Sequence, residues 1–65
     1  MNDKELHNEG WWITTSPLAR LNPEEWICSI YKRGRKAWIT ETCKGGFKNP
    51  IEAQEWAFRY LRPFL

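Results

Sequence analysis

The stretch WICSIYKRGRKAWITETCKGGF, residues 26–47, decides the fold of this chain. Its two halves are rich in Trp, Ile, Tyr and Thr, the residue types that favour the pleated, half-buried surface of a β-sheet. The sequence KRGRK lies between them, and Gly34 supplies the one position there that tolerates a positive φ. The stretch therefore predicts a β-hairpin with a basic tip.

The side chains of this hairpin sort onto two faces if its loop has an even number of residues, because the side-chain period of a strand is two. The expected core face is apolar and collects Trp26, Cys28, Ile30, Ala37, Ile39 and Cys43. The other face places aromatic rings next to cations and collects Ile27, Ser29, Tyr31, Arg33, Lys36, Trp38, Thr40 and Thr42. A three-residue loop would move the side chains of one strand to the opposite face.

The chain has 65 residues, among them five Trp, three Phe and two Tyr. A domain of this length has a small core, and large aromatic side chains help a short chain to bury enough apolar surface. We recognise no apolar run of membrane-spanning length and no secretory signal, so we expect no membrane partner and a cytoplasmic location. We expect residues 1–9 to be a flexible polar leader and residues 10–65 to form a single small domain.

Charge is unevenly distributed along the sequence. Residues 31–48 carry six cations and one anion, whereas the rest of the chain carries four cations and seven anions, for a formal net charge of +2. A basic hairpin tip on a slightly acidic body favours an anionic partner. Lys and Arg are also common in exposed turns and at sheet edges, where they need no partner.

The segment that begins Asn22-Pro23-Glu24-Glu25 has two interpretations. An Asn cap, a Pro and two acids are typical of a helix start, and the apolar residues that follow fall at helical spacing, so a helix over residues 23–33 is an alternative. We favour a strand, because WICSIY contains poor helix formers and faces a strand partner at residues 37–43.

Two further elements complete the predicted fold. Residues 11–16 (WWITTS) predict a first strand, whereas residues 16–23 contain two X-Pro steps and predict a loop. KGGF at residues 44–47 is expected to break the third strand, after which Asn49 and Pro50 begin a helix. The apolar stripe of this helix consists of Ala53, Trp56, Ala57, Tyr60, Leu61 and Phe64. The order predicts an α+β fold, a three-stranded antiparallel sheet packed on one C-terminal helix (β-β-β-α), with the other face of the sheet open.

Candidate catalytic and metal-binding residues are scarce. His7 is the sole histidine and lies in the expected leader, so no Ser-His-Asp or Cys-His set is recognisable, and no glycine-rich phosphate loop is present. Cys28 and Cys43 share the predicted core face, which favours two buried thiols over a disulfide or a zinc site. We expect a protein that is not an enzyme and binds no metal or cofactor.

Three motifs point to a known family: Trp26-x-Cys28-x-Ile30, Ala37-Trp38-Ile39, and Gly46-Phe47 followed by Pro50-x-Glu52-Ala53-x-x-Trp56-Ala57. Over residues 26–60 the chain resembles AP2-like DNA-binding domains and, more closely, the arm-binding domains of tyrosine recombinases. The resemblance implies a three-stranded sheet packed on one helix, with the sheet laid in the DNA major groove. It places Tyr31 and Trp38 at positions that touch DNA, and Ile30, Ala37 and Ile39 in the core. The chain departs from the family in that WWITTS carries no arginine and five residues separate Ile39 from the glycine pair.

The first functional hypothesis is a nucleic-acid-binding module that contacts DNA through the open face of the sheet. Cations would bind phosphates, and aromatic rings would contact sugars or stack on bases. The predicted DNA-binding residues are Tyr31, Arg33, Arg35, Lys36, Trp38, Thr40, Lys44 and Lys48.

The second hypothesis is a protein-interaction module, such as an adaptor or a phage-type inhibitor, that recognises an acidic or apolar protein surface. Tyr31, Trp38 and one of the two N-terminal tryptophans would be its anchors, because exposed aromatic residues beside arginine are typical of binding hot spots. A homodimer that buries this face is a variant of the same hypothesis, and a monomer is equally compatible with the sequence. A third possibility is that Tyr31 and Trp38 form only a cross-strand pair that stabilises the hairpin.

Overall fold

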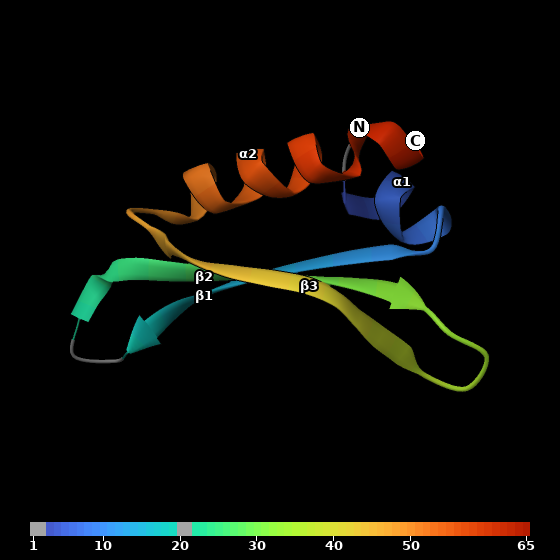
Figure 1. The fold of residues 1–65 in the computed structure, drawn as a ribbon, viewed down its shortest axis with the longest axis horizontal. Coiled ribbons are helices and arrows are strands. Elements are labelled where there is room, and N and C mark those ends of the chain that lie inside the picture. Colours follow the sequence, from blue (N-terminus) through green and yellow to red (C-terminus); the bar gives the residue numbers. More distant parts are fainter. Residues whose placement is uncertain (1–2, 20–21) are drawn as a thin grey trace.

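Residues 3–19 and 22–65 are described by a computed structural model of the chain. The elements are α1 (Asp3–Asn8), β1 (Trp11–Ala19), β2 (Asn22–Arg33), β3 (Trp38–Phe47), α2 (Pro50–Leu61) and a final 3₁₀ turn, Arg62–Phe64. The strands form one antiparallel sheet in the order β1-β2-β3, and α2 lies across one face of it (Figure 1). The predicted α+β class, with three strands before a C-terminal helix, is confirmed.

β2 is the central strand, and its place in the sheet decides between the two interpretations of residues 23–33. It pairs with β1 from Trp11↔Lys32 to Ala19↔Asn22 and with β3 from Trp26↔Phe47 to Arg33↔Trp38. The helix alternative is therefore wrong. Two flanking ladders satisfy the backbone of a segment whose residues suit a strand, so tertiary pairing outweighs the helix-start signal at its beginning.

The strands are longer than the sequence indicated. β1 continues through Pro17 to Ala19 and β2 begins at Asn22, so most of the predicted loop over residues 16–23 is strand, and residues 20 and 21 lie outside the described residues. β3 continues through the glycine pair to Phe47, contrary to the predicted break at KGGF. Gly46 has a φ of 87°, which lets the chain turn there without leaving the ladder.

The hairpin loop has an even number of residues, as expected, but Gly34 has a different role from the predicted one. Arg33 pairs with Trp38, which leaves residues 34–37 as the loop. Gly34 does not have a positive φ. A Cβ at this position would lie 2.6 Å from the Ala37 carbonyl oxygen, which accepts a hydrogen bond from the Gly34 N–H at 3.0 Å. Glycine is needed because the two backbones approach closely.

A one-residue bulge in β3 changes the predicted faces of the hairpin. Ile30 pairs with Thr42 and Tyr31 pairs with Thr40, so Glu41 is the extra residue. The Glu41 carboxylate accepts a hydrogen bond of 3.3 Å from the Tyr60 hydroxyl of α2. Desolvation, followed by the charge of Glu41 and this hydrogen bond, raises the pKa of Tyr60 above its ordinary value.

The bulge explains two errors of the face prediction. Thr42 was expected on the open face and instead lies beside Ile30 on the α2 side, where it is half-buried. Cys43 was expected in the core and instead pairs with Ser29 and is exposed. Two further predicted core residues, Ala37 and Ile39, are also exposed, because the end of the hairpin extends beyond α2 (Figure 1).

The core lies between the sheet and the two α-helices. Its buried residues are Leu6, Trp11, Cys28, Ile30, Ala53, Ala57 and Leu61. The small Ala53 and Ala57 let the axis of α2 approach the sheet closely, while Trp56 and Tyr60 fill the space alongside. Burial raises the pKa of the Cys28 thiol to about 11, so this residue is an inert part of the core.

α2 begins as the sequence predicts. The Asn49 side chain accepts a hydrogen bond of 2.8 Å from the Glu52 N–H, and Pro50 occupies the first helical turn. The Glu52 carboxylate reaches back to the Lys48 N–H at 3.2 Å. These contacts satisfy backbone donors at the start of the helix and fix where the chain leaves β3.

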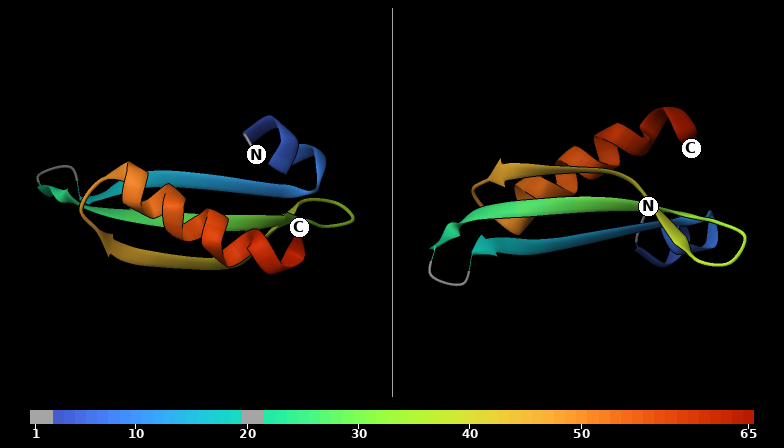
Figure 2. Two further views of the ribbon diagram at one scale, coloured as in Figure 1. Left: turned by 90° about the horizontal axis from the view of Figure 1, so that it is seen from above. Right: turned by 60° about the horizontal axis from the view of Figure 1, so that its bottom comes forward.

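The N-terminal segment differs from the predicted polar leader. Residues 3–8 form α1, which packs against β1 (Figure 2), and Leu6 is only 1% exposed. Gly10, with a φ of 91°, turns the chain from α1 into β1, and its carbonyl accepts a hydrogen bond of 2.9 Å from the Arg33 N–H. One apolar side chain in a polar segment is enough to attach it to a core this small. Residues 1 and 2 lie outside the described residues.

Candidate nucleic-acid interface

The face of the sheet opposite α2, hereafter the open face, is uncovered by the described residues over most of its area, and α1 reaches its hairpin end through His7 (Figures 1 and 2). β1 contributes Trp12 to it, since the neighbouring Trp11 is buried on the α2 side. The register then aligns Trp12, Tyr31 and Thr40 in one row across the three strands. Four predicted site residues lie on this face: Tyr31, Arg33, Trp38 and Thr40.

Four side chains form an aromatic cluster at the hairpin end of the open face: His7, Trp12, Tyr31 and Trp38. The Trp12 ring lies 5.4 Å from Tyr31, in tilted geometry, and 5.8 Å from Trp38, edge to face. The His7 ring lies 5.1 Å from Trp38. These separations suit favourable aromatic pairs, so each ring is held by a neighbour. Trp12 is nevertheless 46% exposed.

Arg33 links this aromatic cluster to the basic hairpin tip. Its guanidinium carbon lies 5.3 Å from the centre of the Trp38 ring, which is a cation–π distance. The same guanidinium donates a hydrogen bond of 2.7 Å to the carbonyl oxygen of His7. α1 and β3 thus hold the cation in place on the open face, although the side chain is exposed.

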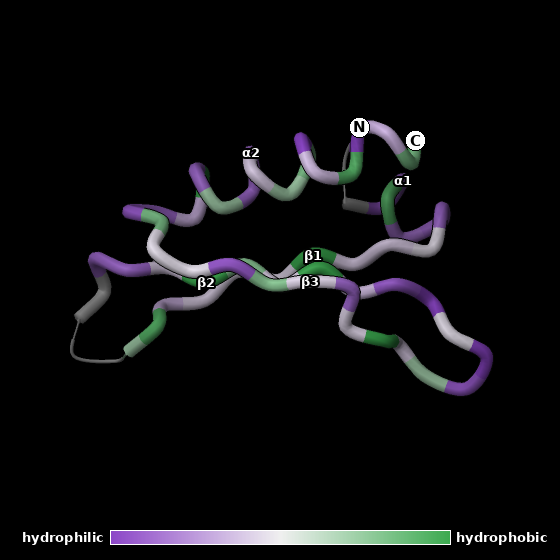
Figure 3. The backbone as a smooth tube through the Cα atoms, viewed as in Figure 1, coloured by the Kyte–Doolittle hydropathy of each residue, from purple (hydrophilic) through white to green (hydrophobic). Residues whose placement is uncertain are grey.

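The hairpin tip adds two exposed cations, Arg35 and Lys36. In Figure 3, hydrophilic residues occupy much of the loop, and the loop bends away from α2 toward the side of the open face. Lys32 and Arg35 also line a hollow beside the α1–β1 turn, together with Glu9. Four cations from residues 32–36 are therefore concentrated at one end of the molecule.

Among the residues that the structure describes, none on the central part of the open face is acidic. By strand alternation and register, its described members are Trp12, Thr14, Ser16, Ile27, Ser29, Tyr31, Arg33, Trp38, Thr40 and Cys43. Apart from the aromatic residues and Arg33, most of these residues carry hydroxyl groups, namely Thr14, Ser16, Ser29 and Thr40. Glu24 and Glu25 lie at the opposite end of β2, far from the hairpin tip. An anion that approaches the hairpin end of this face meets cations and aromatic rings.

Two predicted site residues lie elsewhere. The Lys44 ammonium is 5.8 Å from the centre of the Phe47 ring and 5.9 Å from that of Trp56, so its side chain lies on the α2 side. The β3 bulge causes this, since it changes the face of the residues that follow it, from Thr42 to Lys44. Lys48 lies at the far end of the sheet and lines a hollow with Glu24 and Glu25. The structure does not bring these two lysines to the aromatic cluster.

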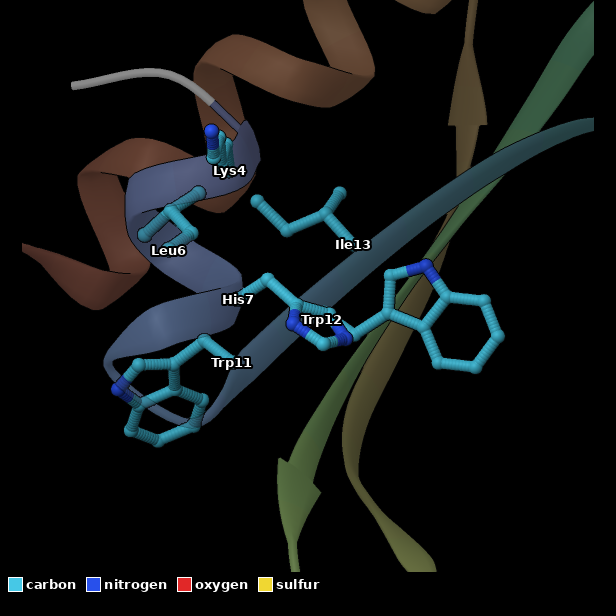
Figure 4. Close-up of a pocket in the computed structure, with 6 residues that line it drawn as sticks. All are labelled: Lys4, Leu6, His7, Trp11, Trp12 and Ile13. Atoms are coloured by element: carbon cyan, nitrogen blue, oxygen red, sulfur yellow. The ribbon is translucent and has the colours of Figure 1, made fainter.

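Two members of the aromatic cluster were not among the predicted site residues. The Trp11-Trp12 pair did indicate that one ring would point outward, and Figure 4 shows the two rings on opposite sides of β1. Nothing in the sequence marked His7 as a site residue, because its contact with Trp38 depends on the unexpected packing of α1 against β1. Leu6 and Ile13 fill the space between α1 and β1 in the same view, so this seam is a part of the core.

Within residues 3–19 and 22–65, no group of three or more His, Cys, Asp or Glu side chains could hold a metal ion. No helix in the described part of the chain is long and apolar enough to cross a bilayer.

Comparison with protein families, with curated proteins and with solved structures finds no match to this chain.

Proposed function

We propose that this protein is a nucleic-acid-binding module that uses the hairpin end of the open face. The observation that carries the proposal is the position of Arg33, which lies on Trp38 within the aromatic cluster and beside the exposed Arg35 and Lys36. Cations next to half-exposed aromatic rings match a ligand that combines phosphates with planar bases.

Each group has a distinct role in this proposal. Arg35 and Lys36 attract and bind phosphates, whereas the fixed Arg33 offers a positioned donor next to Trp38. Tyr31 and Thr40, in the same row as Trp12, supply hydroxyl groups for sugar or phosphate oxygens. The resemblance to AP2-like and arm-binding domains supports the same use of the sheet, although WWITTS in β1 carries no arginine.

Salt dependence tests this function directly. If Arg33, Arg35 and Lys36 each neutralise one phosphate, raising the salt from about 50 to 200 mM weakens binding roughly 20- to 40-fold, because counterions are released on binding. The measurement is fluorescence anisotropy of labelled DNA, single-stranded and duplex, at several salt concentrations. No affinity for either DNA at the lowest salt would refute the proposal.

A second candidate function is protein binding, which the 46% exposure of Trp12 on the open face favours. Trp12, Tyr31 and Trp38 would then anchor an adaptor-type or inhibitor-type interface, or a second copy of this chain. The signature of the second copy is a dimer in sedimentation experiments whose dissociation changes little with salt. That result, together with no DNA binding, would replace the nucleic-acid proposal.

A further inference from the structure

We propose that the nucleic acid bound here is single-stranded and that one of its bases stacks on Trp12. This inference rests on the nucleic-acid-binding function proposed above and specifies its ligand. It follows from three features of the sheet: the accessibility of Trp12 on the open face, the concentration of cations at the hairpin end, and the carboxylates at the other end.

Trp12 is placed as a stacking surface. The ring is 46% exposed, yet Tyr31 at 5.4 Å and Trp38 at 5.8 Å support it from the sheet. A supported ring loses little freedom when a base stacks on it, so less of the stacking free energy is spent on ordering the side chain. Stacking needs a base whose face is free, which an unpaired nucleotide provides and a base pair inside a duplex does not.

The position of the cations does not suit a duplex laid along the sheet. The longest dimension of the molecule is 36 Å, and over that length B-DNA carries roughly 20 phosphate charges. Lys32, Arg33, Arg35 and Lys36 all lie at the hairpin end, although the Lys32 ammonium lies on the α2 side, 5.9 Å from the centre of the Trp11 ring. A duplex along the open face would bring phosphates toward the other end, where the two carboxylates of Glu24 and Glu25 outnumber the one ammonium of Lys48 and offer no net attraction.

A single strand avoids this conflict. It is flexible enough to place a few phosphates at the hairpin tip while its bases turn toward the aromatic cluster. Arg33 lies between these two regions, because it belongs to the hairpin and contacts Trp38. The strand then needs only the hairpin end of the open face, and the end near Glu24 and Glu25 stays unoccupied.

The test compares a labelled oligothymidylate of about 15 nucleotides with a duplex of the same length, by anisotropy at low salt. We expect the single strand to bind more tightly. Trp12→Leu keeps an apolar side chain but removes the stacking surface, and should weaken single-strand binding about 10- to 100-fold. Leu18→Ala is the control variant. Leu18 is also an exposed apolar residue of β1 (56% exposed), but it lies near the other end of the strand. The affinity of this variant for the single strand should equal that of the wild type.

The possible outcomes distinguish a failure of this inference from a failure of the proposed nucleic-acid-binding function. Tighter binding of the duplex than of the single strand would overturn the inference and leave the nucleic-acid function intact. An unchanged affinity of Trp12→Leu, with a wild-type circular dichroism spectrum, would overturn the stacking of a base on Trp12. Absence of binding to either DNA would refute both the inference and the proposed function.

Discussion

Reversing both tip charges, with Arg35→Glu and Lys36→Glu in one variant, is expected to abolish DNA binding while the protein stays folded. The two side chains are exposed in the hairpin loop, so their replacement should change the free energy of unfolding by less than about 0.5 kcal/mol. Attraction to phosphate becomes repulsion at the entrance to the site. Arg33 is left in place because its contacts with His7 and Trp38 hold α1 and the aromatic cluster together.

The control for this variant is Arg59→Glu with Arg62→Glu. Both double variants change the formal net charge from +2 to −2, but Arg59 and Arg62 are exposed at the end of α2, away from the open face. The control should retain most of the DNA affinity. Equal loss of affinity in the two variants would mean that overall charge alone governs binding, and would contradict a site at the hairpin tip.

Leu6→Ala is expected to cost about 2–5 kcal/mol of the free energy of unfolding, a large share of the total for a small domain. Leu6 is 1% exposed and belongs to the core with Trp11 and Leu61. Six residues are too few for a stable isolated helix, so α1 depends on this contact. Loss of α1 also frees Arg33 from the His7 carbonyl, and DNA affinity should fall as well.

Leu18→Ala provides the same chemical change at an exposed position of β1. Chemical denaturation of Leu6→Ala and Leu18→Ala measures their free energies of unfolding. The value for Leu18→Ala should lie within about 0.5 kcal/mol of the wild type. If Leu6→Ala were as stable as Leu18→Ala, α1 would not be a part of the core.

The fold class could be predicted from local patterns because those patterns agree with the tertiary structure. The Asn49-Pro50 start and the Ala53 and Ala57 positions describe α2 without reference to any other segment. The hairpin was likewise marked by β-forming residues on both sides of Gly34. Where local signals conflicted, as at Asn22-Pro23, only the pairing of β2 with two neighbouring strands decided the outcome.

The candidate site could be predicted only in part, because it depends on contacts that have no local signature. Strict alternation correctly placed Tyr31 and Trp38 on the open face. It failed after Glu41, where the bulge moved Lys44 to the α2 side and Cys43 to the open face. The contact of His7 with Trp38 depends on the packing of α1 against the core through Leu6. The polar sequence of residues 1–9 does not predict this packing.

The most direct test of the proposed nucleic-acid site on the open face is NMR mapping of backbone and indole N–H signals during titration with an oligothymidylate. We predict that the shifts concentrate on Trp12, Tyr31, Trp38 and the 34–37 loop, with the indole signals of Trp12 and Trp38 among the largest. Signals of α2 from Glu52 to Arg59 should scarcely move. Shifts that centre on α2, or that spread evenly over both faces of the sheet, would contradict it.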